Sequence, residues 1–306
     1  MTKNTGAVTT AQKIKSEASG KVLTVVSYVF ITLFALVCLL PFVMVISASF
    51  SSEGAILEQG MGILPRDFSL ESYKLIFQSG KYIFGSYGVT IAMTIGGTAV
   101  GLIVISMTGY ALQRKDFPLR NVISFFIYFT TLFSAGLAPT YLWMVNGLHL
   151  KDSYLAIFLP LLMTPWLVFL MKNFIKAIPH ELTESGKIDG ANDMRIFVSI
   201  FLPNLKPSLA TVGLFLALGY WNEWYYSMLY IQNKPYQPLQ YYLYKIINQA
   251  QALRNSVAGS QVAIADLPSN TLKMATAVIA TGPVIFFYPF VQKYFIAGMT
   301  VGAVKG

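Results

Sequence analysis

The stretch that decides the fold runs from Pro179 to Pro203 and reads PHELTESGKIDGANDMRIFVSIFLP. It contains many charged residues and two glycines, although it lies between two long apolar runs. Pro179 suits the first turn of a helix, because its missing N–H would have no partner there, and the acids that follow favour the same place beside the positive end of the helix dipole. Gly190 interrupts the pattern and Asn192 offers a second N-cap. The sequence therefore predicts two short helices joined by a bend, lying in water next to a membrane.

The composition of the whole chain is that of a membrane protein. Of 306 residues, 55% are hydrophobic and 11% are charged, and the mean hydropathy is +0.58, whereas a soluble domain carries about 25% charged residues. The net charge of +9 comes from basic residues at the ends of apolar runs, which is typical of anchoring to anionic lipid head groups. We therefore expect membrane lipid, and no nucleic acid, as a partner. The single cysteine, Cys38, excludes an intramolecular disulfide.

Six apolar segments are long enough to cross the hydrocarbon core, which needs about 20 residues. We expect an all-α fold: a polytopic membrane protein in which a polar cytoplasmic tail, residues 1–21, precedes a transmembrane domain at residues 22–306. The expected spans are residues 22–47, 87–112, 122–144, 154–174, 207–231 and 272–294. We expect Gly136 and Pro139 to break the third of these spans, and Pro160 and Pro165 lie inside the fourth.

Details within these segments refine the expectation. The first span is too long for the core of a signal peptide, about 7–15 residues, although Ser47-Ala48-Ser49 resembles a cleavage site and removal stays a minor alternative. Gly96, Gly97 and Gly101 predict close packing of the second span against its neighbours. Between the last two spans, residues 239–252 have the pattern of an amphipathic helix on the membrane surface.

The distribution of lysine and arginine predicts the orientation. With the amino terminus inside, 14 of the 22 basic residues fall on cytoplasmic segments, as the positive-inside rule requires. Six spans then place both termini and the stretch from Pro179 to Pro203 in the cytoplasm.

That stretch contains Glu184-Ser185-Gly186, followed after three residues by Gly190 and after nine more by Ile200 to Pro203. This spacing resembles the EAA signature of membrane permeases of binding-protein-dependent ABC importers. The sequence departs from the family at Ser185-Gly186, where two alanines are usual, and a second glycine loosens the first helix by about 1 kcal/mol relative to alanine. IDGA at Ile188 to Ala191 and the terminal GAVKG are similar to the sugar-importer branch. The likeness covers about residues 20 to 306.

The resemblance implies a cytoplasmic EAA coupling helix that docks on an ATPase, where the glutamate that corresponds to Glu184 meets a basic residue. The residues expected to couple to the ATPase are Glu181, Glu184, Gly186, Asp189, Gly190, Ala191, Leu202 and Pro203. In relatives the carboxyl-terminal tail also reaches toward the ATPase, here through Gly302, Lys305 and Gly306. The alternative for this tail is a basic flank that holds the last span in place.

The resemblance also implies the partners: a second permease subunit, giving a heterodimer, an ABC ATPase dimer, and an extracytoplasmic solute-binding protein. No run reads GxxxxGK[ST], and the two histidines, His149 and His180, lie in loops on opposite sides, so no histidine-based metal site is expected. We therefore expect no catalytic residue, metal or cofactor in this chain, which is not an enzyme; ATP and Mg²⁺ belong to the partner ATPase. The expected location is the bacterial cytoplasmic (inner) membrane.

The hexapeptide Trp221 to Tyr226 is the main candidate for the substrate path. Glu223 is the only acid inside an expected span, and a charge there costs a few kcal/mol unless it is paired or hydrated. Aromatic and polar groups suit sugar recognition, but this position lies about 22 Å from the cytoplasmic start of the span, where aromatic belts are usual. A gate-lining or structural role and direct sugar contact both stay open. The substrate-path candidates are Tyr141, Trp143, Asn146, Trp166, Trp221, Asn222, Glu223 and Tyr225.

The expected cargo is an oligosaccharide, moved by alternating access. Phe125 to Trp143 looks like permeases of polysaccharide-degrading bacteria, a group that includes importers of pectin- or alginate-derived oligosaccharides. The positive net charge suits acidic sugars, but lipid anchoring explains it equally well. The alternatives are an ABC importer of another solute, such as a peptide, a polyamine or phosphate, and a secondary transporter without an ATPase. The secondary transporter predicts several intramembrane charges, and only Glu223 qualifies. A membrane-embedded enzyme lacks a candidate nucleophile, acid–base pair or metal cluster.

Overall fold

The computed structural model of the chain describes residues 18–78, 80–179, 181–257 and 269–303. In these ranges the regular elements are helices, accompanied by one isolated antiparallel bridge between Ser51 and Phe68. The expectation of an all-α membrane fold is therefore confirmed for the described residues. In chain order the elements are α1 (Ala18–Ser49), α2 (Glu53–Gln59), α3 (Glu71–Gln78), α4 (Gly80–Gln113), α5 (Arg120–Leu132), α6 (Leu137–Leu142), the π-helix η1 (Trp143–Gly147), α7 (Leu155–Leu162), α8 (Pro165–Lys176), α9 (Glu181–Ile188), α10 (Asp193–Ile196), the π-helix η2 (Phe197–Phe201), α11 (Leu202–Asn204), α12 (Lys206–Trp221), α13 (Tyr225–Tyr230), α14 (Leu239–Val257) and α15 (Asn270–Ala303).

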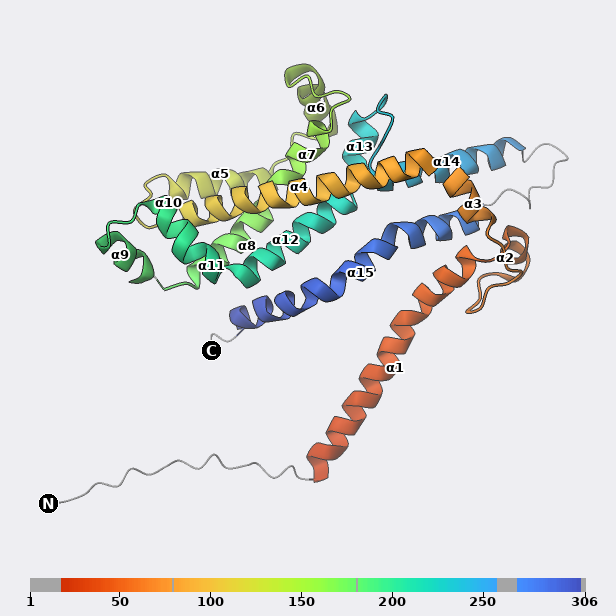
Figure 1. Cartoon of the computed structure of the whole chain (residues 1–306), viewed down its shortest axis with the longest axis horizontal. Coiled ribbons are helices and arrows are strands. Elements are labelled where there is room, and N and C mark those ends of the chain that lie inside the picture. Colours follow the sequence, from red (N-terminus) through yellow and green to blue (C-terminus); the bar gives the residue numbers. More distant parts are fainter. Residues whose placement is uncertain (1–17, 79, 180, 258–268, 304–306) are drawn as a thin grey trace.

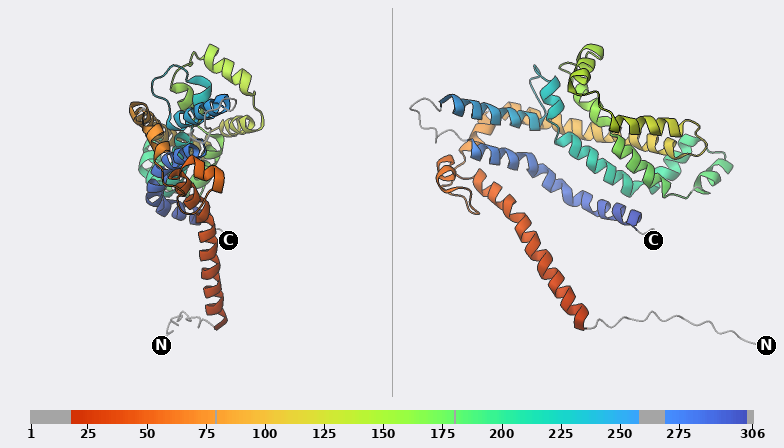
Figure 2. Two further views of the ribbon diagram at one scale, coloured as in Figure 1. Left: turned by 90° about the vertical axis from the view of Figure 1, so that its right-hand side faces the viewer. Right: turned by 180° about the vertical axis from the view of Figure 1, so that it is seen from behind.

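Helix α4 is the centre of the bundle. It contacts α8 and α12 more extensively than any other pair of helices does, and α15 lies against α12 (Figure 1). Helix α1 leaves this bundle: it meets α15 near its own carboxyl end, and the rest of it stands away in every view (Figures 1 and 2). The apolar window of α1 is entirely exposed. A surface of this kind is stable only against lipid or another apolar partner.

By length and apolar composition, three described helices are able to cross a membrane: Lys21–Ser49, Gly80–Gln113 and Leu155–Lys176. Two bent pairs, Arg120–Leu132 with Leu137–Gly147 and Asp193–Asn204 with Lys206–Tyr230, raise that number to five if each pair is one span. The expectation of six spans therefore stays a prediction. The last expected span, 272–294, lies within α15, which extends further at both ends.

The break that the sequence predicts at Gly136 and Pro139, inside the expected span 122–144, is present. Helix α5 ends at Leu132, and the chain turns by 118° before α6 and η1. Gly136 causes the break, because its φ of +85° lies in the left-handed region that other residues avoid, and Pro139 then occupies the first turn of α6. The expected span 207–231 is also interrupted, since α12 ends at Trp221 and α13 begins at Tyr225.

Glycines set the closest helix contacts, as the sequence predicts for two of three positions. A Cβ atom on Gly97 would lie 2.3 Å from the ring of Tyr220, and one on Gly101 would lie 3.0 Å from Leu216. Gly96 has no such neighbour within 4 Å, so the prediction is wrong there. The two glycines let α12 approach α4 closely enough to bury Tyr220.

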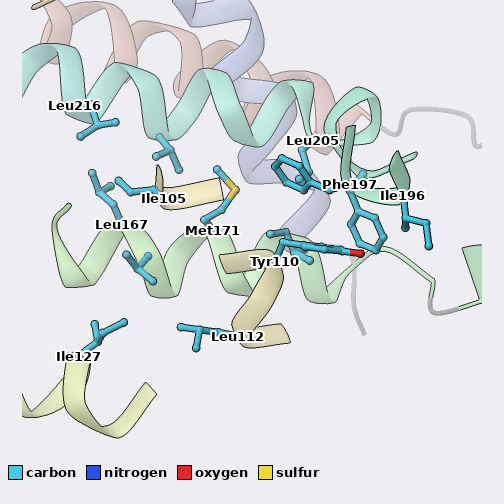
Figure 3. Close-up of a cluster of buried hydrophobic side chains, with 14 residues drawn as sticks. Ile105, Tyr110, Leu112, Ile127, Leu167, Met171, Ile196, Phe197, Leu205 and Leu216 are labelled. Carbon is cyan, nitrogen blue, oxygen red and sulfur yellow. The ribbon is translucent and has the colours of Figure 1, made fainter. Parts of the chain in front are cut away.

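The main core lies among the helices next to α10 and η2, and Figure 3 shows its side chains. It brings together Ile105 of α4, Met171 of α8, Phe197 of η2 and Leu216 of α12. A second core joins α14 to α4 and α15 through Leu239 and Leu243. The expected amphipathic helix at 239–252 is present as α14, which is longer than predicted and lies against the bundle.

Candidate coupling segment and substrate path

The segment from Glu181 to Asn204 forms the two short helices with a bend that the sequence predicts. Helix α9 ends in a Schellman motif: the amide of Gly190 donates to Lys187 O and that of Ala191 donates to Gly186 O, at 3.0 and 2.9 Å. This motif needs a left-handed residue, and Gly190 has a φ of +73°. The side chain of Asn192 then caps α10 by accepting from the Arg195 amide at 2.8 Å. The bend is therefore a fixed turn, and the predictions of a turn at Gly190 and a cap at Asn192 are confirmed.

Gly186 has a packing role in addition to its place in the signature. It is buried, and a Cβ atom there would lie 3.1 Å from side-chain carbons of both Ile196 and Ile200. The glycine thus lets α9 lie directly on α10 and η2. An alanine, which the resemblance leads one to expect, would require these isoleucines to shift by a few tenths of an ångström.

The outer face of α9 is exposed and mixed in character. Glu181 and Glu184 lie in its first turn, and both are exposed. Ile188 in its last turn is 85% exposed, which is unusual for a large apolar side chain beside a polar segment. Asp189 and Gly190 are also exposed, whereas Ala191 packs against the main core. Leu202 and Pro203 begin α11, and Leu202 packs against the main core.

An ion-pair network that the sequence analysis missed ties this segment to the bundle. Arg114, just after α4, pairs with both Asp116 and Asp193 of α10, and Lys187 of α9 donates to Asp116 at 2.8 Å. The side chain of Arg114 is only 15% exposed and lies over the ring of Tyr110. Hydrogen bonds from Arg114, and then from Lys187, hold the pKa of Asp116 well below its usual value. The four residues come from two parts of the chain, 114–116 and 187–193, which only the tertiary structure brings together, so spacing gives no signal for the pairing between them.

Glu223, the acid inside the expected fifth span, lies in the break between α12 and α13. It is 6% exposed, and its carboxylate accepts from the amides of Tyr226 and Ser227 and from the Ser227 hydroxyl, at 2.5 to 3.3 Å. The carboxylate thus satisfies the free N–H groups at the start of α13. This geometry accounts for a buried acid without a ligand.

The other substrate-path candidates do not converge on one site. Trp221 is buried and donates from Nε1 to Ala280 O at 3.0 Å, which ties α12 to α15. Asn222 is exposed beside it, and its amide donates to Leu218 O. Trp166 packs edge-on against Phe215.

The remaining candidates lie around α6, η1 and α13. Tyr141 of α6 stacks on Tyr230 of α13 with ring centroids 5.6 Å apart, so these two elements meet. Trp143, Asn146 and Tyr225 are exposed. In the tail, Gly302 lies in the last turn of α15, while Lys305 and Gly306 lie outside the described residues. No group of three or more metal-ligating side chains occurs in the part of the chain that the structure describes.

The described residues thus form a helical membrane protein with an exposed two-helix segment, α9 and α10, at one end of its bundle. Residues 101–301 match the family described as "Binding-protein-dependent transport system inner membrane component". The match takes in the whole of the segment from Glu181 to Asn204, and this chain belongs to that family.

Similar proteins cover nearly the full length. The chain is 40% identical to the polygalacturonan/rhamnogalacturonan transport system permease protein YtcP of Bacillus subtilis (strain 168), over 91% of this chain and 96% of that protein. It is 27% identical to the arabinooligosaccharides transport system permease protein AraQ of the same strain, over 90% and 94%. A crystal structure of a bacterial ABC transporter involved in the import of the acidic polysaccharide alginate contains a chain that superposes with a TM-score of 0.74, at 31% identity over 91% of this chain and 98% of that chain.

Proposed function

We propose that this chain is a permease subunit of an ATP-driven ABC importer that moves oligosaccharides rich in uronic acids across the cytoplasmic membrane. The observation that carries the proposal is the full-length similarity, at 31–40% identity, to transport proteins named for polygalacturonan/rhamnogalacturonan and for alginate. Galacturonate and alginate units share a pyranose ring with a carboxylate. The substrate class therefore combines apolar sugar faces, hydroxyl groups and negative charge.

The segment from Glu181 to Asn204 is the contact with the ATPase in this proposal. The exposed acids Glu181 and Glu184 offer negative charge to a basic partner, and Ile188 offers an apolar anchor beside them. The Schellman turn and the ion pairs of Arg114 make the segment rigid. A rigid segment passes on a rotation of the ATPase dimer as a movement of α8 and α12 rather than absorbing it. ATP and Mg²⁺ act in that partner.

The same proposal includes six spans, with both termini and α9 on the cytoplasmic side. A solute-binding protein delivers the substrate on the outer side, and a second, different permease subunit completes the path. The exposed apolar face of α1 supports a position against lipid or that subunit. Alternating access then requires the two permeases to move relative to one another.

Uptake by whole cells tests the proposal. Cells that express the complete transporter should accumulate radiolabelled trigalacturonate, and deletion of this chain should abolish the accumulation. A panel of a peptide, a polyamine, phosphate and maltotriose separates this substrate class from the alternatives. If deletion leaves trigalacturonate uptake unchanged but removes uptake of a non-sugar solute, the assignment to acidic sugars is wrong.

A further inference from the structure

A hollow of about 300 Å³ lies where α14, the first turns of α15 and the break before α13 meet. Its lining includes Trp224, Gln240, Leu243, Tyr244, Lys273 and Thr276. None of these residues belongs to the substrate-path candidates of the sequence analysis. The volume is at the lower end of the range for small-ligand sites, about 300–1,000 Å³.

One wall of the hollow is aromatic. The rings of Trp224 and Tyr244 lie 5.1 Å apart between centroids and are inclined by 33°. Trp224 and Tyr244 are 40% and 39% exposed, so each ring keeps a part of its surface in contact with solvent. An exposed aromatic surface beside a hollow suits the C–H face of a sugar ring, because both are apolar while the sugar's edge stays polar.

The lining of the hollow also contains polar groups and a cation. Lys273 lies in the first turn of α15 and is half-buried. Among the described residues no carboxylate forms an ion pair with it: the nearby Glu53 is engaged instead by the amides of Asn270 and Thr271, at 2.9 to 3.0 Å. Gln240 donates weakly to Asn222 at 3.4 Å, which leaves its amide oxygen able to accept from a hydroxyl group.

We propose that this hollow is a subsite for one uronate unit of the oligosaccharide. The pyranose face lies on Trp224 and Tyr244, the carboxylate pairs with the ammonium group of Lys273, and a ring hydroxyl donates to Gln240. Lys273 is the residue that distinguishes acidic from neutral sugars here, because a half-buried charge pair is screened less than one in open water. The inference rests on the proposed function, since that function supplies the substrate class.

The experiment measures binding directly, because uptake rates also depend on the solute-binding protein. The complete permease–ATPase complex is placed in nanodiscs of zwitterionic lipid, so that no anionic head group competes for Lys273. It is titrated calorimetrically with trigalacturonate and with its neutral trimethyl ester. The variants are Lys273→Gln, Lys273→Arg and Trp224→Ala, and copurification of the ATPase shows that each complex is assembled.

Lys245→Gln is the matched control. Lys245 is also partly buried and lies over an aromatic ring, that of Tyr241, at 5.9 Å, but it does not line the hollow. We expect Lys273→Gln to weaken trigalacturonate binding about tenfold and to leave ester binding unchanged, while Lys273→Arg retains most of the affinity. Trp224→Ala should weaken both ligands, and Lys245→Gln neither.

Equal effects of Lys273→Gln and Lys245→Gln, or equal losses for acid and ester, would overturn the subsite. A wild-type complex that binds neither sugar also overturns it, although uptake by whole cells would still support the proposed function. Binding with the expected pattern in a complex that does not import trigalacturonate would retain the subsite and refute the importer instead.

Discussion

Glu53 illustrates how a single side chain fixes the end of the bundle at which α2 and the start of α15 meet. It is 7% exposed, and its carboxylate accepts from the amide of Asn270 and from the amide and hydroxyl of Thr271, at 2.9 to 3.0 Å. It thereby joins α2 to the first turn of α15, where the helix dipole favours negative charge. Burial opposes ionisation, but the hydrogen bonds outweigh it, so the pKa of Glu53 lies below its ordinary value.

The lowered pKa gives a pH-dependent prediction. A carboxyl whose pKa falls on folding contributes stability above its unfolded pKa, about 4.3, and that stability is lost as the pH falls through the lower, folded pKa. Glu53→Gln should therefore lower the thermal stability of the purified complex at pH 7, by about 1–3 kcal/mol, and should flatten its decline in acid. Differential scanning fluorimetry between pH 3 and 7 makes the comparison, and parallel melting curves for both proteins would contradict it.

Two adjacent glycines provide a matched pair of substitutions in α4. Gly97→Ala places a methyl group against Tyr220 and should destabilise the complex by about 1–3 kcal/mol through overpacking. Gly96→Ala meets nothing within 4 Å and should be neutral or stabilising by up to about 1 kcal/mol, because alanine favours the helix. Melting temperatures of the two variants check this, and equal values would show that the contact between α4 and α12 is looser than described.

At the scale of elements, the features that depend on local sequence were predictable, whereas the contacts between distant parts of the chain were not. The turn at Gly190 and the cap at Asn192 follow from residue type, so the shape of the segment from Glu181 to Asn204, the proposed coupling segment, could be derived from the sequence. The break after α5 was predictable from Gly136 and Pro139, but its angle of 118° was not, because these residue types do not fix the direction in which the next helix runs. The ion pair between Arg114 and Asp193 joins residues far apart in the chain, so their spacing in the sequence does not predict it.

For the substrate-path candidates, too, the sequence did not predict contacts that depend on tertiary structure. The sequence drew attention to Glu223 and Trp221, yet each has its hydrogen-bonding groups engaged by neighbouring backbone. The hollow beside Trp224 depends on how α14 and α15 come together, and its cation Lys273 belongs to a different segment from its aromatic wall. A hydrophobic pattern predicts both helices but not the space between them.

The ion-pair network gives a graded prediction for the coupling segment. Lys187 and Asp116 are about half exposed, at 47% and 48%, so their pair contributes only about 0.2–1 kcal/mol. Arg114 is far less exposed and holds two carboxylates. Arg114→Gln should therefore reduce transport strongly while the ATPase still copurifies, whereas Lys187→Gln should reduce transport less than twofold (about 0.4 kcal/mol). Equal effects of the two variants on uptake would mean that the network does not position α9.

A substitution at Glu184 tests the proposed contact with the ATPase. Glu184→Lys reverses the charge on the exposed face of α9 and should abolish both association with the ATPase and uptake, while membrane insertion stays normal. Glu58→Lys is the control, because Glu58 is an exposed helical acid on α2, at the other end of the bundle (Figure 1). Copurification and uptake are measured for both. A Glu184→Lys complex that retains its ATPase and its transport rate would refute the role given to Glu184.

The whole molecule has two parts with different surroundings. The bundle around α4 is held by two cores and by glycine contacts, whereas α1 stands apart with its apolar surface exposed (Figure 2). The coupling segment lies at one end of the bundle and the hollow lined by Trp224 and Lys273 lies toward the other. In the proposed importer these ends face the cytoplasm and the outside, so a movement of α4 and α12 connects the ATPase contact with the sugar.

The most direct test of this arrangement uses the exposed Ile188. In a Cys38→Ser background, Ile188→Cys gives a single thiol at the tip of α9. The account predicts that a membrane-impermeant maleimide labels it in inverted vesicles but not in intact cells, and that a short bifunctional reagent links it to a nucleotide-hydrolysing subunit. Labelling from the outside of intact cells, or a purified complex that contains no such subunit, would contradict the account.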